Sequence, residues 1–253
     1  MKKIITILLV IMLVGCSSTA TNNGSDLDYI KDKGVLIVGI TDFAPMDYQD
    51  ESGEWIGFDA DVAKNVAEEL GVEAQFVEIE WDNKILELEN KSIDVVWNGM
   101  TLTDEVKSAM ECTKPYINNA QVIVVKKENE NNTDYSSMQF AVEAGSAGEA
   151  IAKENGYDYV SLATQADTLL EVSAGTSDAS VIDLLMAGAM IGEGTSYEDL
   201  VYTVELNSEE YGVGCRKGSD LANYINEAFD KFKSDGSLLE IAKEYGVQES
   251  LID

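Results

Sequence analysis

The alternation of strand-like and helix-like segments constrains the fold of this chain most strongly. Residues 35–40 form a short, almost continuous apolar run, as in a buried strand. Apolar residues then recur every four positions over 58–70, which predicts a helix. An alternating strand over 72–76, a short helix over 85–88 and an apolar strand over 93–96 follow. This order predicts a doubly wound α/β unit.

A second unit of the same kind begins near residue 121. A strand-like run over 211–215 and helical segments over 221–245 remain after it, and they need an apolar surface to cover. We expect the first unit to supply that surface, so that the chain forms two lobes and crosses between them twice. The predicted elements of the second unit are strands over 121–125, 139–142, 159–162, 179–182 and 201–206, and helices over 149–155, 166–173 and 184–191.

The first sixteen residues have the features of a bacterial export signal. Two lysines precede the apolar run Ile4–Val14, which is too short to span a membrane stably. The run ends in Leu-Val-Gly-Cys, which resembles the lipobox of bacterial lipoproteins, in which the cysteine is lipidated and becomes the mature N-terminus. We therefore expect a signal peptide over 1–16 and a lipid on Cys16. A signal peptide that merely happens to end in a cysteine is the alternative.

Residues 17–26 are small and polar, which predicts a flexible tether. No later stretch is long and apolar enough for a transmembrane helix. We expect the body to be exported and held to the cell membrane only by the N-terminal lipid. It would face the outside of the cell, or the periplasm if the host has an outer membrane.

Charge and composition exclude several kinds of function. The formal net charge is -30, with 47 acidic and 17 basic residues, and this weighs against nucleic acid or an anionic membrane surface as a partner. An acidic surface also serves solubility, so the charge does not choose a ligand. The chain has no histidine, which excludes Ser-His-Asp and Cys-His catalysis and histidine-ligated metals. We expect neither a metal ion nor a cofactor.

A turn that follows the apolar strand over 93–96 is a candidate ligand-facing element. Gly99 permits a conformation that a Cβ would obstruct, and Thr101, Thr103 and Asp104 are suited to cap a short helix. Such strand-to-helix turns present N–H groups and hydroxyls to the crevice where open α/β sheets bind ligands. Taken alone, these residues also fit an ordinary strand–helix junction.

Five segments, in order, resemble the bacterial extracellular solute-binding proteins of the polar amino-acid class (family 3), which have the type II periplasmic-binding-protein fold. The resemblance implies two doubly wound α/β lobes, over 27–115 plus 211–253 and over 116–210, with a ligand cleft between them. It also implies a monomer that captures a small polar amino acid or amine by hinge closure and delivers it to an ABC transporter permease. The segments are VGITDFAPMDYQDESGEWIGFDADVAKNVAEELGV, IDVVWNGMTLTDEVKSAMECTKPY, AVEAGSAGEA, SDASVID and EEYGVGCRKGSDLANYINEAFDKFKSDGSLLEIAKEYGV.

The same resemblance implies which first-lobe residues contact the ligand. Phe43 stands where the family has an aromatic ring that stacks on the ligand, and Trp81 matches a second aromatic shelf. Gly99 and Thr101 match a backbone carbonyl and a hydroxyl that contact the ligand, and Met100 between them completes this part of the set. A lone tryptophan such as Trp81 is also common in a core or at a rim.

In the second lobe, the resemblance implies a carboxylate site and an ammonium site. Ser146 and Ala147 lie at the helix N-terminus that helps to hold the ligand carboxylate. Asp183 matches the side chain that pairs with the α-amino group, although an aspartate after a strand is also a common helix cap.

One position departs from the family. Where the family has an arginine that clamps the ligand carboxylate, this chain has Val106. Lys107 is next in sequence but lies about 100° further round a helix, so we expect it to point elsewhere. Loss of a charge-assisted hydrogen bond weakens binding about 10- to 100-fold. The helix N-terminus over 145–148 would compensate in part.

Glu143 is a second departure. It precedes the turn AGSAG and can face the cleft, where it and Asp183 would form a pocket with two carboxylates and no cation. This leads to the hypothesis that the ligand carries an amine or another cationic group and that its carboxylate is unimportant or absent. In the alternative, Glu143 points to solvent, as most glutamates do.

The other two cysteines are Cys112 and Cys215. In an exported protein they can oxidise to a disulfide, and the alternative is that both are buried, unpaired thiols. The resemblance places their segments side by side and antiparallel in the first lobe. We therefore expect the two cysteines to face each other and to form a disulfide.

Two other functions deserve comparison with solute binding. Some proteins of this fold are dehydratase-like enzymes, and paired carboxylates can perform acid–base chemistry. Nothing in the chain places a third catalytic group, so we expect no enzyme activity. A ligand-sensing module would need a signalling domain, which a partner protein would have to provide.

Overall fold

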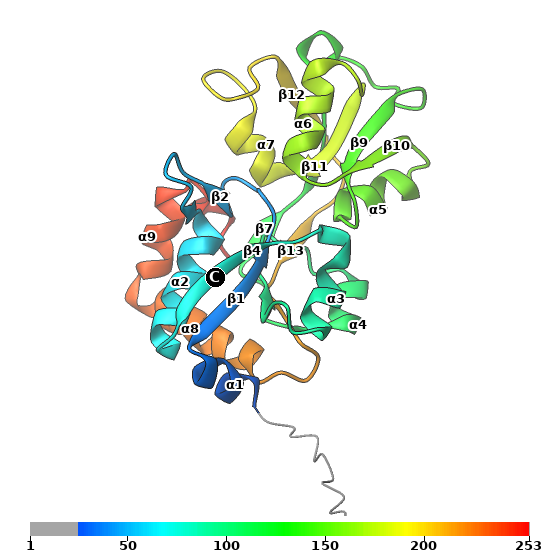
Figure 1. Ribbon diagram of the computed structural model, residues 1–253. Coiled ribbons are helices and arrows are strands. Elements are labelled where there is room, and N and C mark those ends of the chain that lie inside the picture. Colours follow the sequence, from blue (N-terminus) through cyan, green and yellow to red (C-terminus); the bar gives the residue numbers. More distant parts are fainter. Residues whose placement is uncertain (1–24, 253) are drawn as a thin grey trace, which may run out of the picture.

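The computed structural model describes residues 25–252 (Figure 1). The predicted signal peptide with Cys16, and residues 17–24 of the predicted tether, lie outside the described residues. The tether prediction is wrong at its end, because Ser25 and Asp26 begin helix α1 (Asp26–Lys33). The Ser25 hydroxyl accepts a hydrogen bond of 3.1 Å from the N–H of Asp28, as an N-cap serine does.

Two five-stranded sheets form the centres of two lobes, and this confirms the expected fold class (Figure 1). The strand orders are β4-β1-β5-β14-β6 and β10-β9-β11-β8-β12. The strands of the first sheet are β1 (Val35–Ile40), β4 (Glu73–Glu78), β5 (Val95–Val96), β6 (Glu111–Cys112) and β14 (Gly214–Cys215). Those of the second are β8 (Gln121–Lys126), β9 (Gln139–Glu143), β10 (Asp158–Leu162), β11 (Ala179–Asp183) and β12 (Leu200–Glu205).

In the first lobe, β1 is parallel to β4 and β5, whereas β14 is antiparallel to β5 and β6. The predicted apolar stripe of helix α2 (Phe58–Leu70) is buried, and the helix ends at Gly71, whose backbone is in the left-handed region. A small hairpin of β2 (Tyr48–Gln49) and β3 (Trp55–Ile56) gives no clear periodic signal in the sequence. The other elements are the 3₁₀ turn η1 (Trp81–Asn83), α3 (Lys84–Glu89) and α4 (Asp104–Ala109).

In the second lobe, β9 is parallel to β10 and β11, and β8 is antiparallel to β11 and β12. The central strands β8, β9 and β11 are almost entirely buried, as their β-branched composition predicts. The remaining elements are η2 (Lys127–Asn129), α5 (Ala147–Glu154), α6 (Gln165–Ala174) and α7 (Leu184–Met190).

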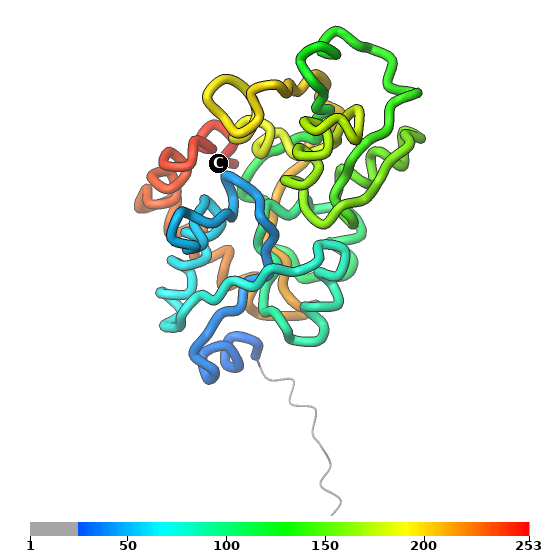
Figure 2. The backbone as a smooth tube through the Cα atoms, turned by 45° about the horizontal axis from the view of Figure 1, so that its top comes forward, coloured from blue at the N-terminus to red at the C-terminus, as the bar shows by residue number. Residues whose placement is uncertain are grey.

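Two strands cross between the lobes as an antiparallel ribbon (Figure 2). They are β7 (Ile117–Asn119) and β13 (Glu209–Tyr211), with Asn119 opposite Glu209. The ribbon overlaps both predicted crossings, and the limits of the lobes in sequence stay a prediction. Any rotation of one lobe against the other must bend this ribbon.

The C-terminal helices cover the first lobe, as expected. Helix α8 (Leu221–Asp235) buries Ile225 and Phe229 in the same core as Trp97, and helix α9 (Ser237–Glu244) packs against α2. The 3₁₀ turn η3 (Gln248–Ser250) follows. Within residues 25–252, the helices are all too short or too polar to cross a membrane.

The prediction that Cys112 and Cys215 form a disulfide is wrong, because both are free thiols. Their strands are adjacent and antiparallel, but Cys112 pairs with Gly214 and Cys215 pairs with Glu111. This offset of one position places the two side chains on opposite faces of the sheet. Cys112 packs beside the smaller core of the first lobe, whereas Cys215 lies in the larger one.

Two buried carboxylates, Asp47 and Asp59, support the turn at Gly99. Asp59 accepts hydrogen bonds from the Gly99 N–H at 2.7 Å and from the Tyr116 hydroxyl at 2.8 Å. Asp47 accepts one of 2.8 Å from the amide of Asn98. Burial raises the pKa of Asp59 to about 7, and burial together with the nearby charge of Asp59 raises the pKa of Asp47. The turn is thus held by groups whose charge is unfavourable in the folded protein.

We expect Asp59→Asn to make stability less dependent on pH. Between the ordinary value of 3.8 and about 7, folded Asp59 keeps a proton that the unfolded chain has lost. The free energy of unfolding of the wild type therefore falls as the pH rises through this window, by up to roughly 1.4 kcal/mol per pH unit for this group. Asparagine has no such proton to lose. Urea unfolding at acidic and mildly alkaline pH measures the difference.

The stability of Asp59→Asn relative to the wild type should improve steadily as the pH rises. Glu51→Gln is the matched control, because this side chain lies in an exposed loop and its substitution should leave the pH profile unchanged. Parallel profiles for the wild type and Asp59→Asn would contradict the prediction.

Candidate functional site

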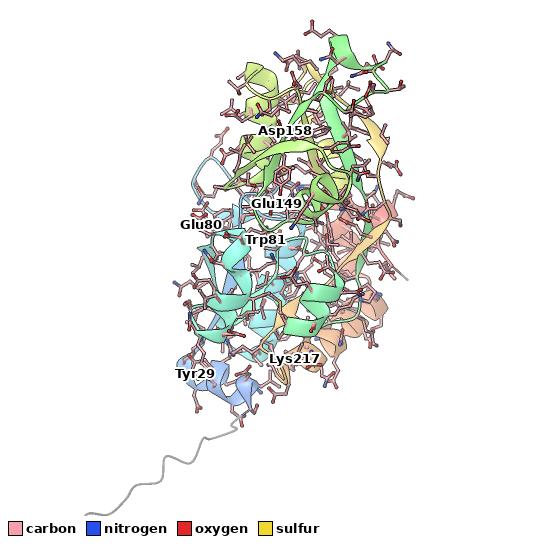
Figure 3. All side chains as sticks on the ribbon, turned by 90° about the vertical axis from the view of Figure 1, so that its right-hand side faces the viewer. Tyr29, Glu80, Trp81, Glu149, Asp158 and Lys217 are labelled. Carbon is pink, nitrogen blue, oxygen red and sulfur yellow. The ribbon has the colours of Figure 1, made fainter. Side chains whose placement is uncertain are left out.

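A cavity of about 350 Å³ lies between the lobes and brings the predicted ligand-binding residues together. Its volume is within the range of small-molecule pockets, roughly 300–1,000 Å³. In Figure 3, Trp81 lies on the side of the first lobe that is turned toward the second, and Glu149 lies on the facing side. All the predicted contact residues line the cavity: Phe43, Trp81, Gly99, Met100 and Thr101 from the first lobe, and Glu143, Ser146, Ala147 and Asp183 from the second.

The turn at Gly99 depends on glycine for two reasons. Its φ is 55°, in the left-handed region that favours glycine. A Cβ at this position would also lie 2.5 Å from the ring of Phe43. Since the Gly99 N–H is bound to buried Asp59, the turn and the Phe43 ring are fixed together at the cavity wall.

Thr101 offers the cavity an acceptor. Its hydroxyl donates a hydrogen bond of 2.9 Å to Glu209, so its proton is already engaged and its lone pairs remain. Two residues further on, the Thr103 hydroxyl accepts a hydrogen bond of 3.2 Å from the N–H of Val106, which confirms the predicted N-cap of a short helix. An acceptor at Thr101 suits an ammonium group better than a carboxylate.

Asp183 is held in place by three side chains. The amide of Asn119 donates to it at 2.6 Å, the amide of Gln165 at 2.6 Å and the hydroxyl of Tyr211 at 2.5 Å. Burial and then the neighbouring charge of Glu209 raise its pKa to about 7. Asp183 ends strand β11 and occupies the N-cap position of α7, but its side chain makes no capping hydrogen bond and is instead a positioned carboxylate.

Glu143 faces the cavity and not the solvent, as the hypothesis required. Its side chain is 2% exposed, and its Oε1 has no hydrogen-bond partner among the described residues. Burial, and then the charge of Asp183, raise its pKa to about 8, while Lys84 acts in the opposite direction. Such a carboxyl gains most from a ligand that brings a hydrogen-bond donor or a positive charge.

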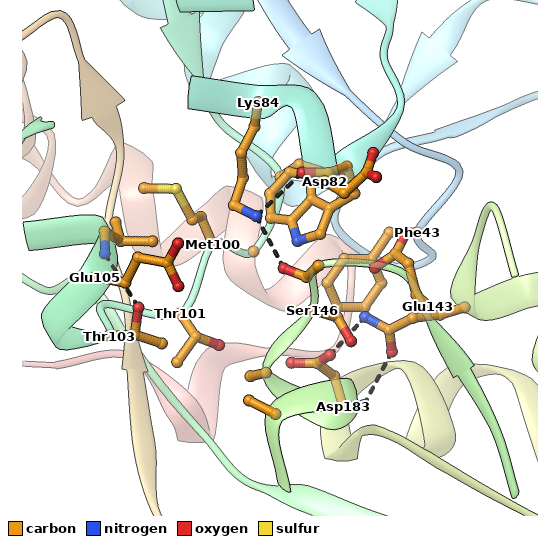
Figure 4. A pocket seen from close by; sticks show the side chains of 18 of the residues that line it. Phe43, Asp82, Lys84, Met100, Thr101, Thr103, Glu105, Glu143, Ser146 and Asp183 are labelled. Carbon is orange, nitrogen blue, oxygen red and sulfur yellow. Dashed lines mark hydrogen bonds between the residues drawn. The ribbon is translucent and has the colours of Figure 1, made fainter. Parts of the chain in front are cut away.

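The expectation of a pocket without a cation is wrong, because Lys84 lines the cavity (Figure 4). Its ammonium donates to the carbonyls of Trp81 at 3.0 Å and Gly145 at 2.9 Å, and it lies 4.8 Å from the centre of the Trp81 ring. Burial lowers its pKa. Lys84 lies three residues after Trp81, a spacing that puts both on one side of a helical segment, but the sequence does not show that this side faces the cavity.

Val106, at the position where the resemblance implies an arginine, lines the cavity, whereas Lys107 is exposed and does not, as expected. Five carboxylates line the cavity against the single lysine: Asp82, Asp104, Glu105, Glu143 and Asp183. The described residues contain no cluster suited to ligate a metal ion. The net charge of the lining favours a cationic group on the ligand.

Glu209 connects the cavity to the ribbon between the lobes. Its Oε1 accepts hydrogen bonds from Thr101 of the first lobe at 2.9 Å, from Gln121 of the second lobe at 2.8 Å and from Asn119 of the ribbon at 2.7 Å. Asn119 also binds Asp183. The sequence gives no periodic or motif signal for this network, which depends on the pairing of β7 with β13.

Comparison with known proteins identifies the family. Residues 36–248 match the bacterial extracellular solute-binding proteins, family 3. The chain is 29% identical over 248 residues to the L-cystine-binding protein TcyJ of Escherichia coli (strain K12), covering 94% of this chain and 92% of that protein. It is 31% identical over 268 residues to the ABC transporter glutamine-binding protein GlnH of Bacillus subtilis (strain 168), covering 97% of each.

A solved structure extends the similarity to three dimensions. It is an ABC uptake transporter substrate-binding protein from Streptococcus pneumoniae with bound histidine, and it superposes with a TM-score of 0.82 at 28% identity, covering 91% of this chain and 99% of that one. Sequence and fold thus agree over nearly the whole length. The chain belongs to the bacterial extracellular solute-binding proteins, family 3.

Proposed function

We propose that this protein captures a small polar amino acid or amine through its positively charged group, in the cavity between the lobes, and presents it to the permease of an ABC importer. Solute binding itself follows from membership of the family. The pair Asp183 and Glu143 carries the proposal about the ligand, because both are buried at one cavity and both gain from a neighbouring ammonium.

The names of the relatives support an amino acid as the ligand. They bind cystine and glutamine, and the structural neighbour holds histidine. Each of these ligands carries an α-ammonium group. In the proposed complex this group takes Asp183, Glu143 and the Thr101 hydroxyl as its acceptors, and the rings of Phe43 and Trp81 flank the rest of the ligand.

Contacts between the lobes support capture by hinge closure. Lys84 of the first lobe binds the carbonyl of Gly145 in the second, and a Cβ at Gly145 would lie 2.6 Å from the Cα of Asp82. The lobes therefore touch beside the cavity. We infer that a ligand favours this arrangement by adding contacts to both lobes, with β7 and β13 as the hinge.

The cellular arrangement follows from the N-terminal sequence. We infer that the residues before Cys16 are removed with the signal peptide, and that a lipid on Cys16, the new N-terminus, anchors the protein as a monomer to the outer face of the cell membrane. The relatives named above are binding proteins, which supports a protein without enzyme activity.

We expect Asp183→Asn to weaken ligand binding about 10- to 100-fold, because a charge-assisted hydrogen bond contributes roughly 1.5–3 kcal/mol. A thermal-shift panel of the common L-amino acids, L-cystine and their decarboxylated amines first identifies which compounds bind the wild type. Calorimetry of the tightest one with each variant then measures the change.

Glu51→Gln is the control, since this carboxylate is exposed to solvent and lies outside the cavity. Its substitution should change the affinity less than about threefold, as for other exposed charges. If no compound of the panel stabilises the wild type, the proposed function is wrong. If Asp183→Asn binds as tightly as the wild type, Asp183 is not the ammonium site.

Affinity should rise as the pH increases from about 6 to about 8. The pKa values of Asp183 and Glu143 are raised to about 7 and about 8, so both hold protons at the lower pH. Accepting an ammonium group favours the ionised form, and binding therefore releases protons, with up to about a tenfold gain per pH unit for each proton. Calorimetry in buffers of different ionisation enthalpy counts the protons, with a ligand that does not titrate in this range. Tighter binding at the lower pH would contradict this assignment.

Lipidation is tested with the full chain expressed in a bacterial host. The wild type should incorporate labelled palmitate and partition into detergent, whereas Cys16→Ser should do neither. Cys112→Ser is the matched control and should behave as the wild type. Labelling of Cys16→Ser would place the lipid elsewhere.

A further inference from the structure

Lys84 brings a positive charge to a cavity that is otherwise lined by carboxylates and neutral groups. It is the single basic side chain among the described residues that line the cavity, and it is 8% exposed. Val106, where the family has its carboxylate-binding arginine, lines the same cavity. The cavity therefore has an apolar side chain where the resemblance implies an arginine, and a different cation in its lining.

The contacts of Lys84 leave it free to bind an anion. An ammonium group has three donors, and the carbonyls of Trp81 and Gly145 engage two of them at 3.0 and 2.9 Å. Carbonyl acceptors do not neutralise its charge. Four carboxylates lie near enough to act on it, Glu143, Glu105, Asp82 and Glu149, but none forms an ion pair with it within 4 Å in the described structure. Its positive charge is therefore available to a ligand.

The surroundings of Lys84 add to this potential. Gly145, whose carbonyl it binds, directly precedes the N-cap Ser146 of helix α5, and Ala147 at the first helical position lines the cavity. The first N–H groups of a helix have no partner within it and carry partial positive charge. Lys84 and this helix end come from different lobes and meet at one edge of the cavity.

The same cavity also contains groups of opposite charge. Asp183 and Glu143 project from the ends of β11 and β9, while Lys84 enters from the first lobe (Figure 4). A free α-amino acid carries an ammonium and a carboxylate on one carbon atom. It can satisfy the acceptors and the lysine together, whereas an amine without a carboxylate would leave the lysine uncompensated.

We propose that Lys84 binds the carboxylate of the ligand in place of the arginine that is absent at Val106, so that the ligand is a free α-amino acid and not its decarboxylated amine. The inference rests on the proposed function, because it names the ligand class of the same cavity. It assigns a specificity-determining role to a residue of helix α3, which in this chain replaces a residue of helix α4.

A purely structural role for Lys84 makes a different prediction. If the lysine only connects the lobes through the Gly145 carbonyl, its loss weakens all ligands alike, because closure becomes less favourable for each. If it binds the carboxylate, its loss weakens only ligands that carry one. The ratio of two affinities separates the two roles.

The test measures calorimetric affinities of L-amino acids and their methyl esters, which keep the ammonium group and lose the negative charge. The probes are L-arginine, L-histidine, L-glutamine and L-cystine with their esters, and whichever further common amino acid stabilises the wild type in a thermal-shift panel. The variants are Lys84→Leu, which removes the charge, and Lys84→Gln, which removes it but keeps a donor for the carbonyls. Lys107→Leu is the matched control, because this lysine is exposed beside Val106 and outside the cavity.

We expect the wild type to bind the free amino acid more tightly than its ester. Both Lys84 variants should bind the free amino acid about 10- to 100-fold more weakly than the wild type does, while their affinity for the ester changes less than about threefold. Adding Val106→Arg to Lys84→Leu should restore the preference, and Lys107→Leu should bind as the wild type. Equal losses for acid and ester in both variants, no loss for either, or a wild type that prefers the ester would each overturn the inference and leave the proposed function intact. A wild type that binds neither acid nor ester in any pair would overturn both.

Discussion

The side chain of Asn119 connects the ligand cavity to the hinge ribbon through two hydrogen bonds. Its amide donates to Asp183 at 2.6 Å and to Glu209 at 2.7 Å. One acceptor lines the ligand cavity, and the other lies on the strand by which the chain returns to the first lobe. A buried carboxylate that loses a donor becomes much less favourable. A change in the charge around Asp183 therefore changes the energetics of the ribbon, and ligand chemistry and lobe orientation are linked through one amide.

The buried carboxyl groups of this cavity are only partly compensated by the protein itself. Glu143 has an oxygen without a partner among the described residues, and burial raises the pKa of both Glu143 and Asp183. Evolution could have replaced either by an apolar residue and gained stability. A ligand that brings a positive charge offsets the unfavourable burial of these two groups, and this adds to the binding energy.

The sequence was informative wherever structure depends on local pattern, and less so where it depends on long-range pairing. Runs of apolar residues predicted both sheets, and the family resemblance led to the prediction that Phe43, Trp81 and Asp183 lie at one cavity, where the structure has them. The prediction of a disulfide failed because the pairing of β6 with β14 is offset by one residue, which puts the two cysteines on opposite faces of the sheet. The apolar periodicity of a sequence does not reveal such an offset. The network of Glu209 likewise exists only once β7 and β13 are paired.

Lys84 was missed for a related reason, and its position has a mechanical consequence. On α3 it could be read as a surface lysine, and only its hydrogen bond to Gly145 from the other lobe places it in the cavity. An arginine at position 106 would belong to one lobe whether or not the lobes meet. Lys84 is positioned partly by the opposite lobe, so its ammonium is fully oriented only when the lobes touch. A ligand carboxylate bound there would stabilise that contact directly, which makes recognition of the carboxylate and closure of the lobes depend on the same side chain.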